Sequence, residues 1–128
     1  MDNRAREFGV RAYSIHPGSI AGTELAREAP LEKFIQMGFC DEQGNILSEV
    51  ASSLKSIPQG ASTTIWCATS PLLNNIGGVF CEDADIAELS AGKDVSASGV
   101  KPYSLDETNA RRLWELSEKL ATITFKCK

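Results

Sequence analysis

The segment from Val10 to Leu25 reads VRAYSIHPGSIAGTEL. Its first part, Val10–Ile15, is a short β-prone run that ends at the turn-forming pair Pro17-Gly18, and it predicts a mostly buried strand. In open α/β sheets, ligands bind at the carboxyl ends of the strands. A glycine there lets a ligand approach the backbone, and the Thr23 hydroxyl with nearby amides can donate to phosphate or carboxamide oxygens. The residues alone leave a second interpretation open, in which the pair is a plain turn after a strand.

The flanking segments alternate between helical and β-prone patterns. Residues 2–8 read as the last turns of a helix, with Gly9 in the left-handed position that ends it. Residues 58–70 read as a helix, residues 77–82 as a short buried strand, and residues 104–121 as a terminal helix. Ser104 and Glu107 match the S-x-x-E capping box at the start of that last helix. This order predicts an α/β fold with parallel strands, although two strands make no viable sheet on their own.

Two segments lack sustained periodicity. Residues 24–56 allow one or two short helices before Met37 and a turn over Asp41–Asn45, and such a long excursion after a strand is often a lid or a binding loop. Residues 82–99 are acidic, small and rich in serine and glycine, which favours a mobile surface connection.

Length and charge exclude several classes of protein. The 128 residues allow one domain, and 13 basic against 17 acidic residues give a net charge of −4. Without a basic surplus to neutralise phosphates, nucleic-acid binding is not expected. The first seven residues lack the apolar core of a signal peptide, and prolines, asparagines and glycines interrupt the uncharged stretch 56–81. We therefore expect no membrane span and a cytoplasmic location.

The cysteines do not form a metal-binding pattern. No C-x-x-C pair occurs among them, so we expect isolated thiols that are mostly buried in a reducing compartment and no metal site. A nucleophile pair of Cys67 with His16 is the functional alternative, but no neighbouring residue in the sequence activates either side chain. His16 is instead expected to be a packed or backbone-capping histidine. The four cysteines are Cys40, Cys67, Cys81 and Cys127.

Two further groups of residues have a structural and a functional interpretation. The acidic residues near position 85 lack the glycine and ligand order of an EF-hand, so a solvated connection is expected rather than a calcium loop. Trp66 and Trp114 are expected to pack in the core or between helices rather than to stack on a ligand. The acidic residues are Glu82, Asp83, Asp85 and Glu88.

Four segments, in order along nearly the whole chain, match the pattern of one protein family. Residues 10–25 resemble its V-x-(hydrophobic)-H-P-G strand with the loop that follows, and residues 39–45 (FCDEQGN) resemble its substrate-loop turn. Residues 58–66 (PQGASTTIW) resemble its next helix. Residues 77–83 (GGVFCED), with Lys101-Pro102-Tyr103 and Leu113-Trp114, resemble its last strand and terminal helix. The chain thus resembles the C-terminal part of short-chain dehydrogenases/reductases, in the branch of retinol-dehydrogenase-like and WW-domain-oxidoreductase-like proteins.

The resemblance implies the C-terminal portion of a doubly wound, Rossmann-like parallel sheet that is incomplete in this chain. It also implies NAD or NADP as cofactor and hydride transfer between nicotinamide and an alcohol or carbonyl substrate. By match to the family's motif, Pro17, Gly18, Ser19 and Ile20 would line the nicotinamide end. Thr23 would bind the cofactor phosphates, one position later than in the usual P-G-x-x-x-T spacing. Residues 10–23 would form the strand and nicotinamide-side loop, and residues 24–56 the substrate loop.

The chain departs from the family's pattern at the two motifs that carry catalysis. The phosphate loop G-x-x-x-G-x-G does not occur, and neither Tyr13 nor Tyr103 has a lysine four residues later, as Y-x-x-x-K requires. No catalytic residue is assigned, and this chain alone is expected to be inactive. We expect it to self-associate or to pair with a missing N-terminal half. The alternative is a non-catalytic α/β interaction module that pairs through its apolar helix faces.

Overall fold

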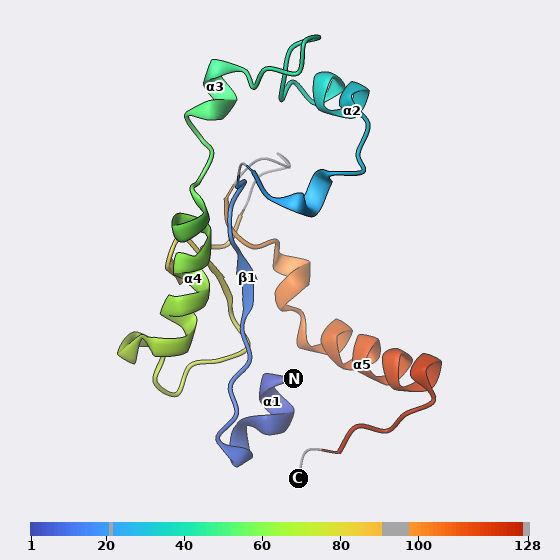
Figure 1. Ribbon diagram of the computed structural model, residues 1–128. Coiled ribbons are helices and arrows are strands. Elements are labelled where there is room, and N and C mark those ends of the chain that lie inside the picture. Colours follow the sequence, from blue (N-terminus) through green and yellow to red (C-terminus); the bar gives the residue numbers. More distant parts are fainter. Residues whose placement is uncertain (21, 91–97, 127–128) are drawn as a thin grey trace. The chain divides into compact units, whose positions relative to one another are not determined.

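The computed structural model describes residues 1–20, 22–90 and 98–126. Helices and short strands follow one another along the chain, as Figure 1 shows, and they make an α/β protein with three strands among the described residues. The chain divides into two units. We call Met1–His16 with Thr63–Lys128 the sheet unit, and Pro17–Ser62 the loop unit.

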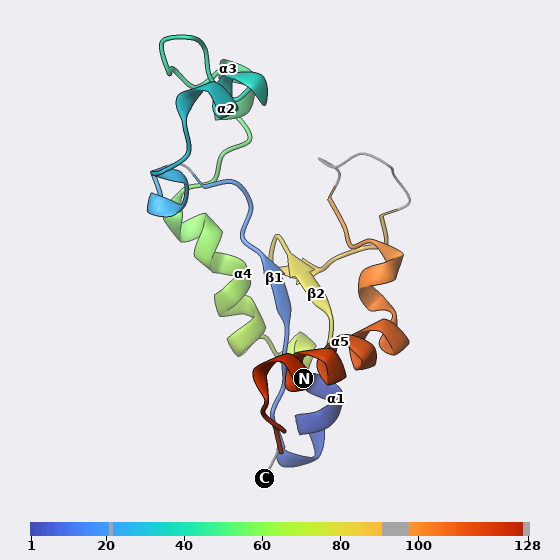
Figure 2. The same ribbon diagram turned by 90° about the vertical axis from the view of Figure 1, so that its right-hand side faces the viewer.

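A mixed sheet with the strand order β1-β2-β3 lies in the sheet unit. β1 (Ser14–His16) runs parallel to β2 (Phe80–Glu82), and Figure 2 shows the two strands side by side. The predicted parallel pairing is therefore confirmed. β3 (Asp85–Ile86) turns back antiparallel to β2, after Asp83 at φ 50° and Ala84 at φ 57°, the left-handed pair of a type I′ turn. The sequence did not predict this hairpin, because Asp-Ala is a weaker turn signal than Asn-Gly or Asp-Gly.

The predicted strand Val10–Ile15 is wrong in its bounds and in its burial. β1 begins at Ser14, and all three of its side chains are exposed. The side chains of a strand point to the two faces of the sheet. Among the described elements β1 has its main contacts with β2, which lies beside it within the sheet, so its faces stay largely in solvent. The preceding residues are still held to the β2 segment, because Gly78 N donates to Ala12 O at 2.8 Å and Ser14 N donates to Val79 O at 3.1 Å.

The predicted last strand, residues 77–82, is shorter than expected. Only Phe80–Glu82 is regular strand, while Gly78 takes a left-handed φ of 71° in the segment before it. The predicted burial is confirmed at Cys81, which is fully buried, and its two neighbours in the strand are half-buried. Residues 91–97 of the predicted mobile connection lie outside the described residues, and residues 82–86 form the hairpin instead.

The first helix is tied to the sheet by one buried side chain. α1 (Asp2–Ala5) continues as the 3₁₀ turn η1 (Arg6–Phe8), and Gly9 follows at φ 73°, which confirms the predicted left-handed helix end. Asp2 Oδ1 accepts from Ala12 N at 3.1 Å, and Arg11 Nη1 donates to Asp2 Oδ2 at 3.3 Å. Asp2 therefore joins α1 to the segment that leads into β1.

The middle helix α4 (Ile57–Thr69) lies within one residue of the predicted helix 58–70. Its start is a capping box that the sequence analysis missed, S-x-x-Q at Ser56 and Gln59. Ser56 N donates to Gln59 Oε1 at 2.8 Å, and Gln59 N donates to Ser56 Oγ at 3.4 Å. In the sheet unit, Thr63 is fully buried and its hydroxyl accepts from Ala84 N at 3.1 Å. The short turn η3 (Pro71–Leu73) follows α4.

The terminal helix α5 (Glu107–Ala121) begins later than predicted. Asp106 caps it by accepting from Thr108 N at 2.8 Å and Asn109 N at 3.0 Å, so the predicted capping box at Ser104 is wrong. Ser104 belongs instead to the 3₁₀ turn η4 (Pro102–Leu105), which leaves the nearer carboxylate to cap the helix. The predicted apolar stripe is present but exposed, at 65% for Leu113 and 77% for Leu120.

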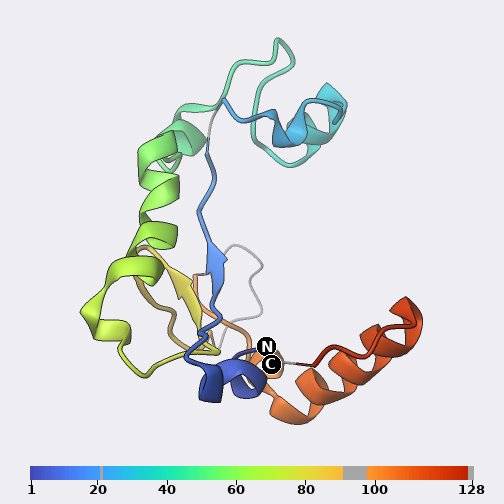
Figure 3. The ribbon, with the colours of Figure 1, turned by 60° about the horizontal axis from the view of Figure 1, so that its bottom comes forward.

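Trp114 packs between α5 and neighbouring segments, as expected for a structural tryptophan. Figure 3 shows the beginning of α5 beside α1. The Arg4 guanidinium lies 4.7 Å from the Trp114 ring centroid, and Phe125 meets the ring edge-on at 5.9 Å. Trp66 on α4 is half-buried.

Inside the loop unit, short helices stand where the sequence allowed them. They are η2 (Glu24–Ala26), α2 (Leu31–Gln36) and α3 (Ser48–Ala51). Cys40 in this unit and Cys81 in the sheet unit are buried free thiols as expected, Cys67 is half-buried, and Cys127 lies outside the described residues. In the described part of the chain, no helix combines the length and apolarity needed to cross a bilayer.

Candidate functional site

The loop after β1 is paired with the residue that precedes α4. Lys55 N donates to Ser19 O at 2.8 Å, and Ile20 forms a parallel bridge with Lys55. The Ile20 side chain also fills the space beside Gly60, which is buried and has no room for a side chain of its own. These contacts hold the first residues of the loop unit against its last residues.

Gly18 is the residue of this loop whose backbone demands glycine. Its φ is +81°, and a Cβ there would lie 2.7 Å from Lys55 Cδ and 2.9 Å from Lys55 Nζ. From the sequence, the missing side chain was expected to leave open space for a ligand. The Lys55 side chain occupies that space, so a ligand approaching on this face meets the lysine.

The other predicted cofactor residues differ in their surroundings. Pro17 and Ser19 are exposed, whereas Ile20 is half-buried by its contact with Gly60. Thr23 is exposed at the start of η2, and its hydroxyl makes no capping hydrogen bond there. The structure therefore brings Pro17–Ile20 together with Lys55, and it leaves the Thr23 hydroxyl outside that pairing.

The predicted substrate loop contains a well-organised turn at Asp41–Asn45, as the sequence indicated. Asp41 Oδ1 accepts from Gln43 N at 2.9 Å and from Asn45 N at 2.8 Å, while Asn45 Nδ2 donates to Asp41 Oδ2 at 2.9 Å. The Asn45 side chain, and then the backbone amides, hold the pKa of Asp41 below its usual value of 3.8. Cys40 pairs with Ile46 on the two sides of the turn.

Lys55 is the site residue that sequence reasoning missed. Its signal was weak, because a single lysine before an uncharged stretch has no motif of its own. The S-x-x-Q box at Ser56 would have placed the helix start directly after Lys55. The pairing with Ser19 joins positions 36 residues apart, and only the folded chain reveals it.

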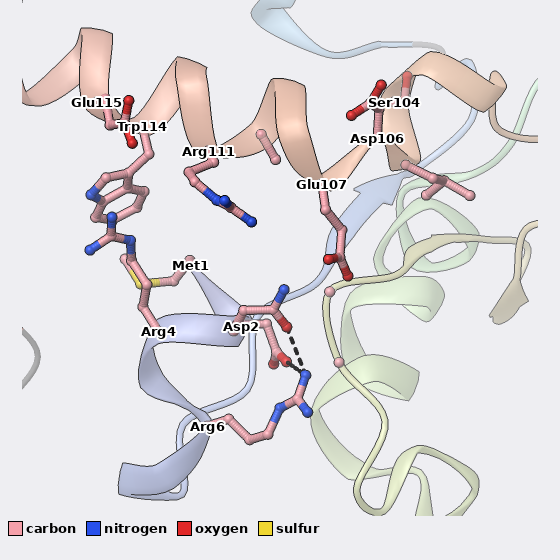
Figure 4. Close-up of a pocket in the computed structure, with 15 residues that line it drawn as sticks. Met1, Asp2, Arg4, Arg6, Ser104, Asp106, Glu107, Arg111, Trp114 and Glu115 are labelled. Carbon is pink, nitrogen blue, oxygen red and sulfur yellow. Dashed lines mark hydrogen bonds and ion pairs between the residues drawn. The ribbon is translucent and has the colours of Figure 1, made fainter.

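A separate cleft of about 630 Å³ lies in the sheet unit, between α1, the Gly77-Gly78 turn and the first turns of α5. Figure 4 shows Arg4 against the Trp114 ring and Arg6 beside Asp2. Arg6 Nη2 also donates to Asn3 Oδ1 at 2.7 Å. Side chains of both charges line the cleft, so it favours neither an anionic nor a cationic ligand. The charged lining residues are Asp2, Arg4, Arg6, Asp106, Glu107, Arg111 and Glu115.

The remaining candidates behave as structural residues. The Cys67 thiol hydrogen-bonds with Cys81, and burial followed by this bond raises the pKa of Cys81 to about 12. The Tyr13 hydroxyl donates to Ile76 O at 2.8 Å. The described residues hold no cluster of three histidine, cysteine or acidic side chains arranged to bind a metal. Glu82, Asp83 and Asp85 belong to the β2–β3 hairpin, and Glu88 follows it.

Curated proteins similar to this chain bear the names of oxidoreductases. A probable oxidoreductase of Streptomyces lividans is 37% identical over 107 residues, which are 84% of this chain and 35% of that protein. The short-chain dehydrogenase/reductase prx1 of Penicillium roqueforti is 32% identical over 125 residues, which are 97% of this chain and 34% of that protein. Human retinol dehydrogenase 11 is 29% identical over 117 residues, which are 91% of this chain and 30% of that protein.

The chain spans about a third of the length of the curated relatives it matches. The matched part includes the loop after β1, α4 and the sheet strands in the case of prx1, because that match extends over nearly the whole chain. No protein-family profile and no solved structure matches the chain.

Proposed function

Because the chain belongs to the short-chain dehydrogenase/reductase family, we propose that it forms part of an NAD- or NADP-dependent oxidoreductase. The reaction is hydride transfer between the nicotinamide ring and an alcohol or carbonyl substrate. In this proposal the chain is the C-terminal portion of a Rossmann-like, doubly wound sheet. The short parallel pair β1–β2 is consistent with that architecture.

The observation that carries this proposal is the pairing of the Pro17–Ile20 loop with Lys55. The loop follows the carboxyl end of β1, which is where open α/β sheets bind their ligands. The groups present fit a phosphate-bearing cofactor, because the Lys55 ammonium lies beside Gly18 and the Thr23 hydroxyl makes no capping bond. Cations and hydroxyls are the donors that phosphate oxygens accept from.

Each residue of the loop has a defined role in the proposal. When bound, the nicotinamide ring would supply or accept the hydride. Pro17, Gly18, Ser19 and Ile20 would position its carboxamide end, and Thr23 would donate to a phosphate oxygen. The Ser19 carbonyl is already engaged by Lys55 N, so the loop offers a shape fixed before the ligand arrives. Residues 24–56 would close over the substrate.

Nuclear magnetic resonance of the ¹⁵N-labelled chain tests the binding role. Titration with NADH and NADPH is expected to shift the amide signals of Gly18, Ser19 and Ile20, and Thr23→Ala is expected to weaken that binding about three- to ten-fold. A titration that leaves the three loop amides unmoved would overturn the assignment of this loop.

Turnover by the chain alone is not expected, because its sequence lacks both Y-x-x-x-K and the glycine-rich phosphate loop. Oxidation of NADH and NADPH with aldehydes, ketones and quinones is the appropriate assay. Turnover proportional to the concentration of the chain would require a base that the family's pattern does not include. Activity in the proposal therefore depends on residues supplied by an N-terminal half.

A non-catalytic interaction module is the second candidate function, and the surface of α5 favours it. Leu113, Leu116 and Leu120 form an apolar stripe that is at least half exposed. Light scattering tests this candidate, because Leu116→Lys would abolish self-association if that stripe were the contact. The location in the proposal is cytoplasmic, consistent with the buried free thiols of Cys40 and Cys81.

A further inference from the structure

The position of Lys55 has a consequence for the ligand that the Pro17–Ile20 loop accepts. Its Cδ, Cε and Nζ atoms lie 2.7, 2.8 and 2.9 Å from the place of a Gly18 Cβ. The end of the stem and the ammonium of Lys55 therefore both lie against Gly18. Lys55 is half-buried as a residue, and its ammonium is a compact charge with three N–H donors.

The backbone of Lys55 is fixed from both sides. Lys55 N donates to Ser19 O at 2.8 Å, and the next residue, Ser56, is held by Gln59 in the capping box of α4. A lysine whose backbone is anchored and whose stem lies along glycine loses fewer rotamers when its ammonium binds a ligand. Part of the side-chain entropy that binding would remove is therefore already lost in the free protein.

We propose that Lys55 is a specificity-determining residue, whose ammonium binds a phosphate oxygen of the nicotinamide nucleotide at the Pro17–Ile20 loop. The inference rests on the proposed function of the loop and adds a residue to it. An ammonium has three N–H donors, so Lys55 can keep its contacts within the loop while it donates to a ligand. A phosphorylated nicotinamide compound is then preferred over its unphosphorylated nucleoside.

The test compares two ligands that differ by one phosphate, reduced nicotinamide mononucleotide and reduced nicotinamide riboside. Binding to the ¹⁵N-labelled full chain is followed at the amides of Gly18, Ser19 and Ile20. The mononucleotide is expected to bind at least ten-fold more tightly than the riboside, as one charge-assisted hydrogen bond implies. The preference is expected to fall as salt is raised from about 20 mM to 500 mM, because exposed charge pairs are screened.

Variants at Lys55 separate its charge from its stem. Lys55→Met and Lys55→Gln keep most of the stem over Gly18 and remove the charge, and each is expected to bring the two affinities within about three-fold. Lys55→Arg is expected to retain the preference. Lys33→Met is the matched control, because it removes the same charge from α2 in the same unit and should leave the preference intact. Retained amide dispersion in each variant shows that the fold persists.

The outcomes distinguish this inference from the proposed function. If both ligands shift the loop amides with equal affinity, or if Lys55→Met keeps the ten-fold preference, Lys55 does not set specificity although the loop still binds nicotinamide. If inorganic phosphate alone shifts the loop as strongly as the mononucleotide, the site is a general anion site and the inference is wrong. If neither nicotinamide ligand shifts the loop, the proposed function of the loop is overturned.

Discussion

The carboxylate of Asp2 lies where a side chain on Gly77 would stand. Asp2 is 3% exposed, and it accepts from the backbone of Ala12 and from the Arg11 guanidinium. One buried carboxylate therefore connects α1, the segment before β1 and the turn before β2. This contact explains why residue 77 is a glycine, because a side chain there would overlap the Asp2 carboxylate.

Substitution of Gly77 by alanine is expected to destabilise the chain by about 1–3 kcal/mol, the usual cost of forcing extra atoms into a packed site. No positive φ constrains Gly77, so the cost comes from the contact with Asp2 alone. Urea unfolding followed by circular dichroism measures it. In an Asp2→Ala background the same substitution should be nearly neutral, and a cost that persists there would refute the steric explanation.

The cap of α5 provides a second test. Asp106→Ala is expected to lower the free energy of unfolding by about 0.5–2 kcal/mol, because Thr108 N and Asn109 N lose their acceptor. Ser104→Ala is the matched control and should change it by less than about 0.5 kcal/mol. Urea melts of the two variants decide between the observed cap and the one that the sequence predicts. If the two variants lost equal stability, Ser104 in η4 would stabilise the chain as much as the Asp106 cap does.

Local signals in the sequence predicted the elements better than their ends. Gly9 and α4 were located within one residue, since a left-handed helix end and a proline in the first turn are properties of the residues themselves. The cap of α5 was misplaced because Ser104 and Asp106 are both good caps, and the choice depends on the preceding 3₁₀ turn.

Features that depend on distant partners were not accessible from the sequence. The exposure of β1 follows from which elements pack against it, and a β-prone run reads the same whether it is covered or open. The contact of Lys55 with Gly18 joins two loops with no motif linking them. The sequence supported Pro17–Ile20 as a candidate site, but only the folded chain shows which side chain lies over it.

The Cys81 thiol is expected to resist alkylation. Burial, and then the hydrogen bond with Cys67, raises the pKa of Cys81 to about 12 from its ordinary 9.0, so almost no thiolate forms at pH 8. Iodoacetamide labelling with peptide mass spectrometry should modify Cys81 only after denaturation. Rapid labelling of Cys81 in the folded chain would contradict its burial.

The same shift predicts how stability depends on alkaline pH. The thiol of the folded chain has the higher pKa, so its contribution is complete below pH 9 and is lost as the pH rises from about 9 to 12. Urea melts across this pH range should show that the free energy of unfolding falls, and the fall should be smaller in Cys81→Ala. An unchanged slope in Cys81→Ala would assign the alkaline loss to other groups.

The Asp41 turn has the opposite dependence on pH. Its pKa is lowered in the folded chain, mainly by the Asn45 side chain, so the stabilising contribution is present above pH 3.8 and is lost as the pH falls further. Carboxyl titration by NMR should place the Asp41 midpoint below 3.8. In Asn45→Ala the midpoint should move upward, and an unmoved midpoint would show that the backbone amides suffice.

Substitution of Gly18 by alanine tests whether the Lys55 side chain occupies the glycine's free space. Gly22→Ala is the matched control, because Gly22 also has a positive φ, +73° against +81°, but among the described residues no atom beyond its chain neighbours lies within 4 Å of its Cβ position. Both variants should incur about 1–2 kcal/mol of backbone strain. Only Gly18→Ala should also displace Lys55, and the amide of Lys55 should then exchange its hydrogen faster because its bond to Ser19 O is weakened.

The Lys55→Ala background completes the comparison. There the truncated side chain no longer reaches Gly18, so Gly18→Ala should cost the same as Gly22→Ala in urea melts. An excess cost of Gly18→Ala that survives in this background would locate the obstruction elsewhere in the loop. Equal costs in the wild-type background would mean that the lysine stem moves aside freely, and a stem that mobile would leave the ammonium without the fixed position that discrimination of a phosphate requires.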